Sequence, residues 1–316
     1  MSAILLAIIG WDPKGWHQLF RTLAPQRDVR LWPETMADPG DVTYACVWQP
    51  PHGMLREYPN LKAIFSLGAG ADGILADPQL PANVPIVRIV DPDLTMRMTE
   101  YVTLHTLMYH RKQRVYETQQ RLRMWHDHDQ SPASEVAVGV MGLGELGRAA
   151  AVGLQRLGFR VHGWSRTQKI IPGVETFYGM IGLEPFLRRT EILVCLLPST
   201  PATRGILNLD LFRRLKFNGA MHGAYVINAS RGDLQVDTDI VIALDDGTLA
   251  GATLDVFPTE PLAITSPLWT HPKIMITPHN AAQSSPRALV SNILRQIDRS
   301  EINLPLDHLV DRGRGY

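Results

Sequence analysis

Residues 136–147 read VAVGVMGLGELG, an apolar run that leads into three glycines spaced as G-x-G-x-x-G. The run predicts a buried β-strand, and the glycines predict a tight turn into a helix. Gly142 permits the turn, Gly144 lets a pyrophosphate approach the backbone, and Gly147 lets the helix pack closely on the strand. The phosphates of a dinucleotide would then face the N-H groups and the positive dipole end of that helix.

The residues that follow complete one strand-helix-strand unit. Apolar side chains recur at helical spacing over 146–157, and Gly158 stands where a left-handed C-cap is expected. Residues 159–164 form a second apolar run and predict a second strand. A glycine-rich turn alone is weak evidence, but within a βαβ unit it predicts a Rossmann-type dinucleotide site.

The end of the second predicted strand is where the adenosine ribose of a dinucleotide binds. The chain reads Ser165-Arg166-Thr167 there, without the acidic residue that suits a free 2′-hydroxyl. An Arg beside two hydroxyls suits a 2′-phosphate, so we expect NADP(H) to be preferred, with NAD(H) possible. The alternative is that these three residues form an ordinary solvated turn.

Composition indicates a globular protein with room for two domains. The chain has 316 residues, of which 45% are hydrophobic, and its 31 basic side chains balance 31 acidic ones. Zero net charge argues against general attraction to nucleic acid or to an anionic membrane. The apolar run 3–9 is too short to span a bilayer and lacks the basic lead-in of a signal peptide. We therefore expect a soluble, cytoplasmic protein with no nucleic-acid or membrane partner.

The two cysteines, Cys46 and Cys195, lie within apolar strand-like runs and lack the spacing of metal ligands. They are interpreted as buried thiols in a reducing compartment. No metal site is expected.

The first hundred residues carry short apolar runs separated by turns that contain Pro and Gly. Continuous apolar runs predict parallel strands that are covered on both faces, at residues 3–9, 44–48, 61–67 and 86–90. Residues 95–123 contain neither Pro nor Gly and predict one long helix, a strut between domains.

The rest of the chain alternates between predicted strands and helices. Strands are expected at residues 136–142, 159–164, 192–197, 225–229, 250–256 and 274–277. This alternation predicts an α/β fold with a doubly wound, Rossmann-type parallel sheet. A last helix over 286–299 is expected to return to the N-terminal domain. The predicted domains are a discontinuous, flavodoxin-like substrate domain (1–99 and 286–316) and an NADP-binding domain (100–285).

Three reactive side chains, Arg231, Glu260 and His279, come shortly after the last three predicted strands. Singly, each has a structural explanation, as a turn cation, a solvated loop acid and a strand-end imidazole. Ligands of such sheets bind beyond the carboxyl ends of the strands, so we expect the three side chains to lie together. A guanidinium can pair with the carboxylate of a 2-oxo acid, an imidazolium can protonate its carbonyl oxygen as hydride arrives, and a carboxylate can keep that imidazole charged.

With these residues in place, the chain resembles the D-isomer-specific 2-hydroxyacid dehydrogenases. The matching motifs are the glycine turn at 142–147, LPSTPATRG at 197–205, NASRG at 228–232, LDVF-x-x-EPL at 254–262 and TPH at 277–279. Within the family, the WSR run at 164–166 and the tail VDRGRGY at 310–316 are most similar to bacterial glyoxylate/hydroxypyruvate reductases of the A type.

The resemblance implies a role for each matching residue. Arg231 would bind the substrate carboxylate, His279 would be the acid/base, and Glu260 would pair with His279. Asp255 would contact the nicotinamide carboxamide. The implied cofactor-binding residues are Gly142, Gly144, Glu145, Leu146, Gly147, Ser165, Arg166, Thr167, Leu197, Pro198, Thr203, Ala229, Arg231 and Asp255.

The first domain is also expected to contribute. Residues 66–72, SLGAGAD, are similar to the family's substrate loop, which implies that the backbone amides of Ala69 and Gly70 hold the substrate carboxylate. The alternative is a structural turn. Trp48 either walls a small substrate pocket or belongs to the core. Trp125 either resembles a family tryptophan near the dimer contact, which implies a homodimer, or belongs to the core.

One segment departs from the family pattern. Residues 216–224, KFNGAMHGA, are longer than the usual connection before the strand that leads to Arg231. They are interpreted as a surface insertion that could alter the cofactor edge of the sheet without changing the catalytic residues.

The expected function is NADPH-dependent reduction of small 2-oxo acids, glyoxylate to glycolate and hydroxypyruvate to D-glycerate, in a cleft between the domains. One alternative is a reductase of bulkier 2-oxo acids such as phenylpyruvate, because the sequence does not give the size of the pocket. Another is a dinucleotide-sensing binding protein, since the C-terminal-binding corepressors resemble the same family.

Overall fold

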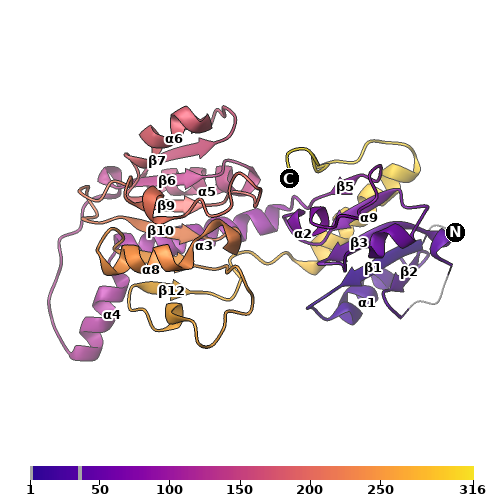
Figure 1. Ribbon diagram of the computed structural model, residues 1–316, viewed down its shortest axis with the longest axis horizontal. Coiled ribbons are helices and arrows are strands. Elements are labelled where there is room, and N and C mark those ends of the chain that lie inside the picture. The colour runs from indigo at the N-terminus through magenta and orange to yellow at the C-terminus, as the bar shows by residue number, and fades with distance from the viewer. Residues whose placement is uncertain (1–2, 35–37) are drawn as a thin grey trace. The chain divides into compact units, whose positions relative to one another are not determined.

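The structure, a computed structural model, describes residues 3–34 and 38–316 and divides into two compact units (Figure 1). One unit comprises Met1–Leu94 and Ser284–Tyr316, and the other comprises Thr95–Gln283. The predicted domain boundaries at 99 and 285 lie five and two residues beyond these limits. Residues 1–2 and 35–37 of the first predicted domain lie outside the described residues.

The first unit contains a five-stranded parallel sheet in the order β2-β1-β3-β4-β5. This order is the flavodoxin-like one. The strands are β1 (Ala3–Ile8), β2 (Asp28–Leu31), β3 (Val42–Trp48), β4 (Ala63–Ser66) and β5 (Ile86–Val87). The α-helices of this unit are α1 (Pro13–Leu23), α2 (Asp72–Leu75) and α9 (Pro286–Glu301), with α3 beginning at its end.

The C-terminal helix α9 packs back onto the first unit. Ile293 and Ile297 of α9 share a hydrophobic core with Phe20 of α1. Arg27, just beyond α1, forms an ion pair with Glu301 at 2.8 Å. The two ends of the chain therefore build one core, and this unit is discontinuous in sequence.

The second unit contains a seven-stranded sheet in the order β12-β11-β10-β9-β6-β7-β8, with every adjacent pair parallel. The strands are β6 (Ala137–Met141), β7 (Arg160–Ser165), β8 (Glu175–Tyr178), β9 (Ile192–Cys195), β10 (Tyr225–Asn228), β11 (Gly251–Leu254) and β12 (Ile274–Ile276). The α-helices are α3 (Pro92–His110), α4 (Gln113–Leu122), α5 (Glu145–Arg156), α6 (Gly179–Leu187), α7 (Leu209–Phe212) and α8 (Asp237–Asp245). The strand order reverses between β6 and β9, which confirms the Rossmann-type doubly wound sheet and marks its ligand-binding edge.

Continuous apolarity in the strands reflects burial on both faces of this sheet. Every residue of β6 is buried. Val138 and Val140 pack with Leu154 of α5, whereas Met141 points to the other face and packs with Phe186 of α6. Helices on both faces thus hold β6, and with it the glycine turn, in a fixed position.

The prediction of one continuous helix over 95–123 is wrong, because the helix is interrupted between His110 and Gln113. The structure has two helices there, and Lys112 between α3 and α4 takes a left-handed φ of 54°. A left-handed residue interrupts the helical hydrogen-bond pattern, and no Gly or Pro marks the break in the sequence. Strands β2 and β8, of four residues each, were also missed because both are short and partly polar.

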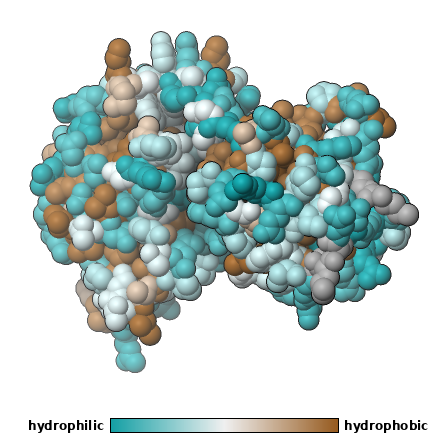
Figure 2. All heavy atoms as spheres, turned by 45° about the vertical axis from the view of Figure 1, so that its right-hand side comes forward, coloured by the Kyte–Doolittle hydropathy of each residue, from teal (hydrophilic) through white to brown (hydrophobic). Residues whose placement is uncertain are grey.

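Two surface observations bear on partners. No helix within residues 3–34 and 38–316 is long and apolar enough to cross a membrane. Hydrophobic side chains reach the surface in several places (Figure 2). At the end of α4 they are Leu122, Met124 and Trp125, which are 63%, 54% and 105% exposed.

Candidate active site

The three glycines after β6 each meet a different steric requirement. Gly142 has a φ of +105°, and a Cβ there would lie 2.6 Å from the carbonyl oxygen of Leu196. A Cβ on Gly147 would lie 1.8 Å from the carbonyl oxygen of Gly142, so only glycine lets α5 start this close to the turn. Around Gly144 no described atom lies within 4 Å of such a Cβ. The turn is therefore tight on the protein side and open where a pyrophosphate would approach.

Helix α5 begins at this open turn. Gly144 is its N-cap and offers no side chain to the first N-H groups of the helix. Glu145 is exposed and Leu146 half-buried in the first turn. Unpaired N-H groups and the helix dipole fit a phosphate group, so this cradle suits a dinucleotide.

The end of β7 presents the three residues predicted to meet the ribose. Ser165 is buried, and its Oγ donates a hydrogen bond to the carbonyl oxygen of Thr167 at 2.8 Å. Arg166 and Thr167 are exposed. The Ser165 hydroxyl therefore shapes the turn, while Arg166 and Thr167 lie at the surface of the protein.

The loop after β9 carries three of the residues predicted to bind the cofactor, Leu197, Pro198 and Thr203. Thr203 Oγ1 donates to the carbonyl oxygen of Pro198 at 2.7 Å, which closes this loop on itself. The hydroxyl of Ser230 donates to the carbonyl oxygen of Leu197, which ties the loop to the end of β10, beside the buried Ala229. The structure thus brings Leu197, Pro198, Thr203 and Ala229 to one sheet edge.

Glu260 and His279 form a direct pair. His279 Nδ1 lies 2.7 Å from Glu260 Oε2, and Glu260 Oε1 accepts a hydrogen bond from the backbone N-H of Phe257 at 3.0 Å. The carboxylate is therefore held in place while it orients the imidazole. The carboxylate occupies Nδ1 and leaves Nε2 as the ring nitrogen for a substrate.

Arg231 lies on the neighbouring loop after β10. The carbonyl oxygen of Arg231 accepts from Asn228 Nδ2 at 3.1 Å, and its Nη1 donates to the carbonyl oxygen of Ser230 at 2.8 Å. A Cβ on Gly232 would lie 1.8 Å from the carbonyl carbon of Phe257, so the loops after β10 and β11 pack backbone against backbone. Arg231, Glu260 and His279 consequently follow three adjacent parallel strands at the same edge.

Asp255, at the end of β11, is buried beneath this edge. Its side chain accepts hydrogen bonds from the backbone N-H groups of Asn280 at 2.9 Å and Ala281 at 3.0 Å. Its backbone carbonyl oxygen accepts from the N-H of His279 at 2.8 Å. Asp255 therefore fixes residues 279–281, the segment that carries the imidazole, by hydrogen bonds.

The predicted substrate residues of the first unit form a cluster of their own. Trp48 ends β3, and a Cβ on Gly68 would lie 2.3 Å from its indole ring. Trp11 stacks on Trp48 with ring centroids 4.3 Å apart. The hydroxyl of Ser66 bonds to the carbonyl oxygens of Gly68 at 3.0 Å and Gly70 at 2.8 Å, which curls the loop that includes Ala69.

The segment 216–224 does not reach the candidate site. It precedes β10 and so lies at the amino edge of the sheet, opposite the edge that carries Arg231. The buried carboxylate of Glu191 anchors it, accepting from the N-H groups of Met221 at 2.9 Å and Ala137 at 3.0 Å. The interpretation that this insertion could alter the cofactor edge is therefore wrong.

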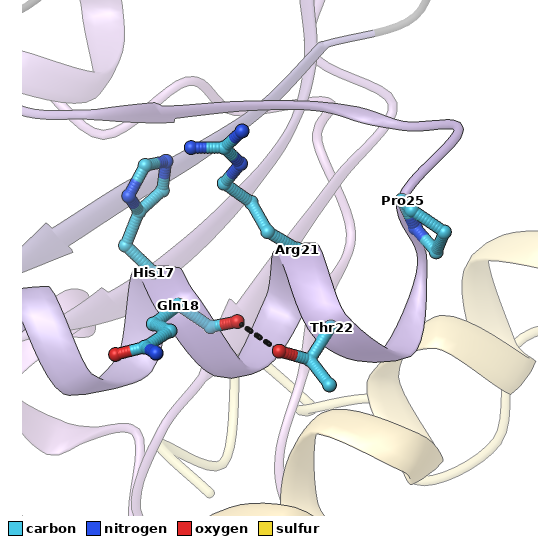
Figure 3. Close-up of a pocket in the computed structure, with 5 residues that line it drawn as sticks. All are labelled: His17, Gln18, Arg21, Thr22 and Pro25. Atoms are coloured by element: carbon cyan, nitrogen blue, oxygen red, sulfur yellow. Dashed lines mark hydrogen bonds between the residues drawn. The ribbon is translucent and has the colours of Figure 1, made fainter.

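Two further features of the described residues do not add a second site. Within the part of the chain that the structure describes, no group of three or more His, Cys, Asp or Glu side chains could hold a metal ion. A shallow pocket of about 290 Å³ on α1 is lined by His17, Gln18, Arg21, Thr22 and Pro25 (Figure 3). Thr22 there only bonds back to the carbonyl oxygen of Gln18 at 2.8 Å.

Comparison with known proteins finds one family. Residues 103–281 match the model of the D-isomer specific 2-hydroxyacid dehydrogenase NAD binding domain. Proteins called glyoxylate/hydroxypyruvate reductase A from Yersinia enterocolitica and Escherichia fergusonii are 39% and 41% identical over 311 residues, which is 97% of this chain and of each relative.

Solved structures with the same fold carry ligands. An NADPH-dependent glyoxylate/hydroxypyruvate reductase from Sinorhizobium meliloti, in complex with NADP and sulfate, superposes with a TM-score of 0.95 at 43% identity, covering 100% of both chains. A probable 2-hydroxyacid dehydrogenase from Rhizobium etli, in complex with NADP, HEPES and L(+)-tartaric acid, gives a TM-score of 0.95 at 44% identity with the same coverage.

Proposed function

Because the chain belongs to the D-isomer specific 2-hydroxyacid dehydrogenase family, we propose that it reduces glyoxylate to glycolate and hydroxypyruvate to D-glycerate with NADPH. The observation that carries this proposal is the 2.7 Å pair of His279 and Glu260 at the edge of a sheet with an open glycine turn. The relatives that match over nearly the full chain are reductases of these two acids.

NADP(H) is the preferred coenzyme in this proposal, with NAD(H) possible, as the NADP complexes of similar proteins support. The diphosphate would bind at Gly144 and the first turn of α5, and the 2′-phosphate at Arg166 and Thr167. When bound, the coenzyme supplies the hydride that reduces the carbonyl carbon. Leu197, Pro198, Thr203, Ala229 and Asp255 complete the proposed coenzyme contacts.

The side chains of this protein supply substrate binding and proton transfer. Arg231 pairs with the substrate carboxylate and polarises the adjacent carbonyl. His279 donates the proton on Nε2 to the carbonyl oxygen and becomes neutral, and solvent then returns a proton to it. Glu260 orients the imidazole through Nδ1 so that Nε2 faces the substrate. The amides of Ala69 and Gly70 and the indole of Trp48 are proposed substrate contacts.

We further propose a cytoplasmic homodimer without nucleic-acid partners. The exposed apolar side chains at the end of α4 support self-association, because clusters of this kind usually mark an interface. Balanced charge argues against a nucleic-acid partner, and two buried, unpaired thiols suit a reducing compartment.

Turnover with a panel of acids tests this function. Purified protein is mixed with NADPH or NADH and with glyoxylate, hydroxypyruvate, pyruvate or phenylpyruvate, and the loss of nicotinamide absorbance is followed. The proposal predicts the highest kcat/KM for glyoxylate or hydroxypyruvate with NADPH. A preference for phenylpyruvate would contradict the proposed substrates and indicate a reductase of bulkier 2-oxo acids. Coenzyme binding without any turnover would indicate a dinucleotide sensor.

A further inference from the structure

A chain of hydroxyl groups runs from helix α3 to the carboxylate below the candidate site. Thr277 Oγ1 donates to Asp255 Oδ1 at 2.6 Å, and Tyr101 Oη lies 2.7 Å from the same Thr277 oxygen. The Thr277 hydroxyl has one proton and gives it to the carboxylate, so Tyr101 must be the donor in the second bond. Both bonds thus point toward Asp255, an arrangement in which each strengthens the next.

The carboxylate at the end of this chain holds the segment that carries His279. Asp255 also accepts from the N-H groups of Asn280 and Ala281, directly after the imidazole. His279 itself has a φ of +52°, a left-handed conformation that is uncommon for a non-glycine residue. The contacts of Asp255 on both sides of His279 help to hold the backbone in this conformation.

Tyr101 is suited to be a permanent donor. Its side chain is buried on α3, and burial raises the pKa of its phenol, so the hydroxyl keeps its proton through the physiological range. Its partner Thr277 follows β12 directly. Tyr101 contacts the catalytic segment without belonging to any motif of that segment.

We propose that Tyr101 is a positioning residue for His279, which it fixes through Thr277 and Asp255. This inference rests on the proposed function of His279 as the proton donor. It predicts that loss of one buried hydroxyl loosens the backbone at residues 279–281 and slows proton transfer while substrate binding is kept.

The chain offers a matched control for the test. Tyr109, two turns further along α3, makes the same kind of bond, with its Oη 2.7 Å from Thr253 Oγ1. Thr253 lies within β11, two residues before Asp255, so Tyr109 bonds to the strand and not to the segment that carries His279. Tyr101→Phe and Tyr109→Phe therefore remove Tyr–Thr bonds of the same length from one helix, and only the first removes a bond that leads to Asp255.

Two readouts are compared for these variants. In hydrogen exchange without coenzyme, Tyr101→Phe is expected to speed exchange of the Asn280 and Ala281 amides about fivefold, whereas Tyr109→Phe leaves them unchanged. In steady-state kinetics, Tyr101→Phe is expected to lower kcat about tenfold with little change in KM. Thr277→Val should act similarly, and Thr277→Ser, which restores the hydroxyl, should recover the wild-type values.

A third comparison links the effect to the imidazole. In a His279→Gln background, Tyr101→Phe is expected to have no further effect on kcat, because the group it positions is gone. Equal effects of Tyr101→Phe and Tyr109→Phe on exchange and kcat, or additive effects with His279→Gln, would overturn the inference. If wild-type protein shows no turnover with any 2-oxo acid, the proposed function fails, and the exchange comparison still decides whether Tyr101 positions the segment.

Discussion

At the scale of single residues, the candidate site depends on a few polar contacts that the motifs anticipate only in part. The sequence places Glu260 and His279 after neighbouring strands, and the structure joins them at 2.7 Å. Tyr101 had no comparable signal, because its partner Thr277 is 176 residues away in the chain and lies in no pattern shared with α3. Contacts of this range depend on how the helix packs on the sheet, which a single sequence does not reveal.

We expect Arg166 to determine the coenzyme preference. Arg166→Ala is expected to lower kcat/KM for NADPH by about 10- to 100-fold, the loss of one or two charged hydrogen bonds. The value for NADH should change little, because NADH has no 2′-phosphate. Steady-state kinetics with both coenzymes measure this effect. The control is Arg188→Ala, which removes an exposed arginine that forms an ion pair with Glu184 of α6. Equal losses for both coenzymes would contradict the assignment.

At the scale of elements, the buried strands and the glycine turn followed directly from the sequence. Continuous apolarity over 136–141 corresponds to β6, and Gly158 takes the expected left-handed φ of +90°. The break at Lys112 could not be predicted, since nothing in its side chain requires a left-handed backbone. The position of the 216–224 insertion depends on Glu191, whose burial becomes evident only when three strands are assembled.

Helix α3 buries a histidine whose titration should affect stability. Burial lowers the pKa of His105 from its ordinary value of 6.5 to about 4, and among the described residues none is within hydrogen-bond distance of its Nδ1. Protonation therefore favours the unfolded chain. The contribution of neutral His105 to the free energy of unfolding is complete above pH 6.5. It is lost as the pH falls towards 4, and the loss is about 3 kcal/mol at most.

His105→Phe removes this titration and keeps a buried aromatic ring. Chemical unfolding at several pH values is expected to show that the free energy of unfolding of the variant depends less steeply on pH between 4 and 6.5 than that of the wild type. Identical slopes for the two proteins would mean that His105 titrates normally in the folded state.

At the scale of the whole molecule, the family and the fold could be assigned before any coordinates. Several motifs in the expected order gave the D-isomer specific 2-hydroxyacid dehydrogenases, and the family model and nearly full-length relatives confirm that assignment. Both sheets have the predicted class of topology, because alternating strands and helices with short connections permit few arrangements. Self-association stays a prediction.

The proposed homodimer is tested at the end of α4. Wild-type protein is expected to have twice the 35.3 kDa mass of one chain in light scattering after gel filtration. Trp125→Asp should raise the dimer Kd at least about tenfold, because a buried interface indole usually contributes more than 1 kcal/mol. Ile181→Asp changes a residue that is 95% exposed on α6 and should leave the mass unchanged. A monomeric wild type, or equal effects of both variants, would refute this interface.

We propose above that His279, oriented by Glu260, protonates the substrate carbonyl. The most direct measurement is kcat of His279→Gln with glyoxylate and NADPH across pH, beside wild type and Glu260→Gln. We predict that His279→Gln loses about 10³-fold in kcat, that Glu260→Gln loses less, and that the pH profiles of the wild type and His279→Gln differ. A His279→Gln enzyme within about tenfold of wild type, with the same pH profile, would contradict it.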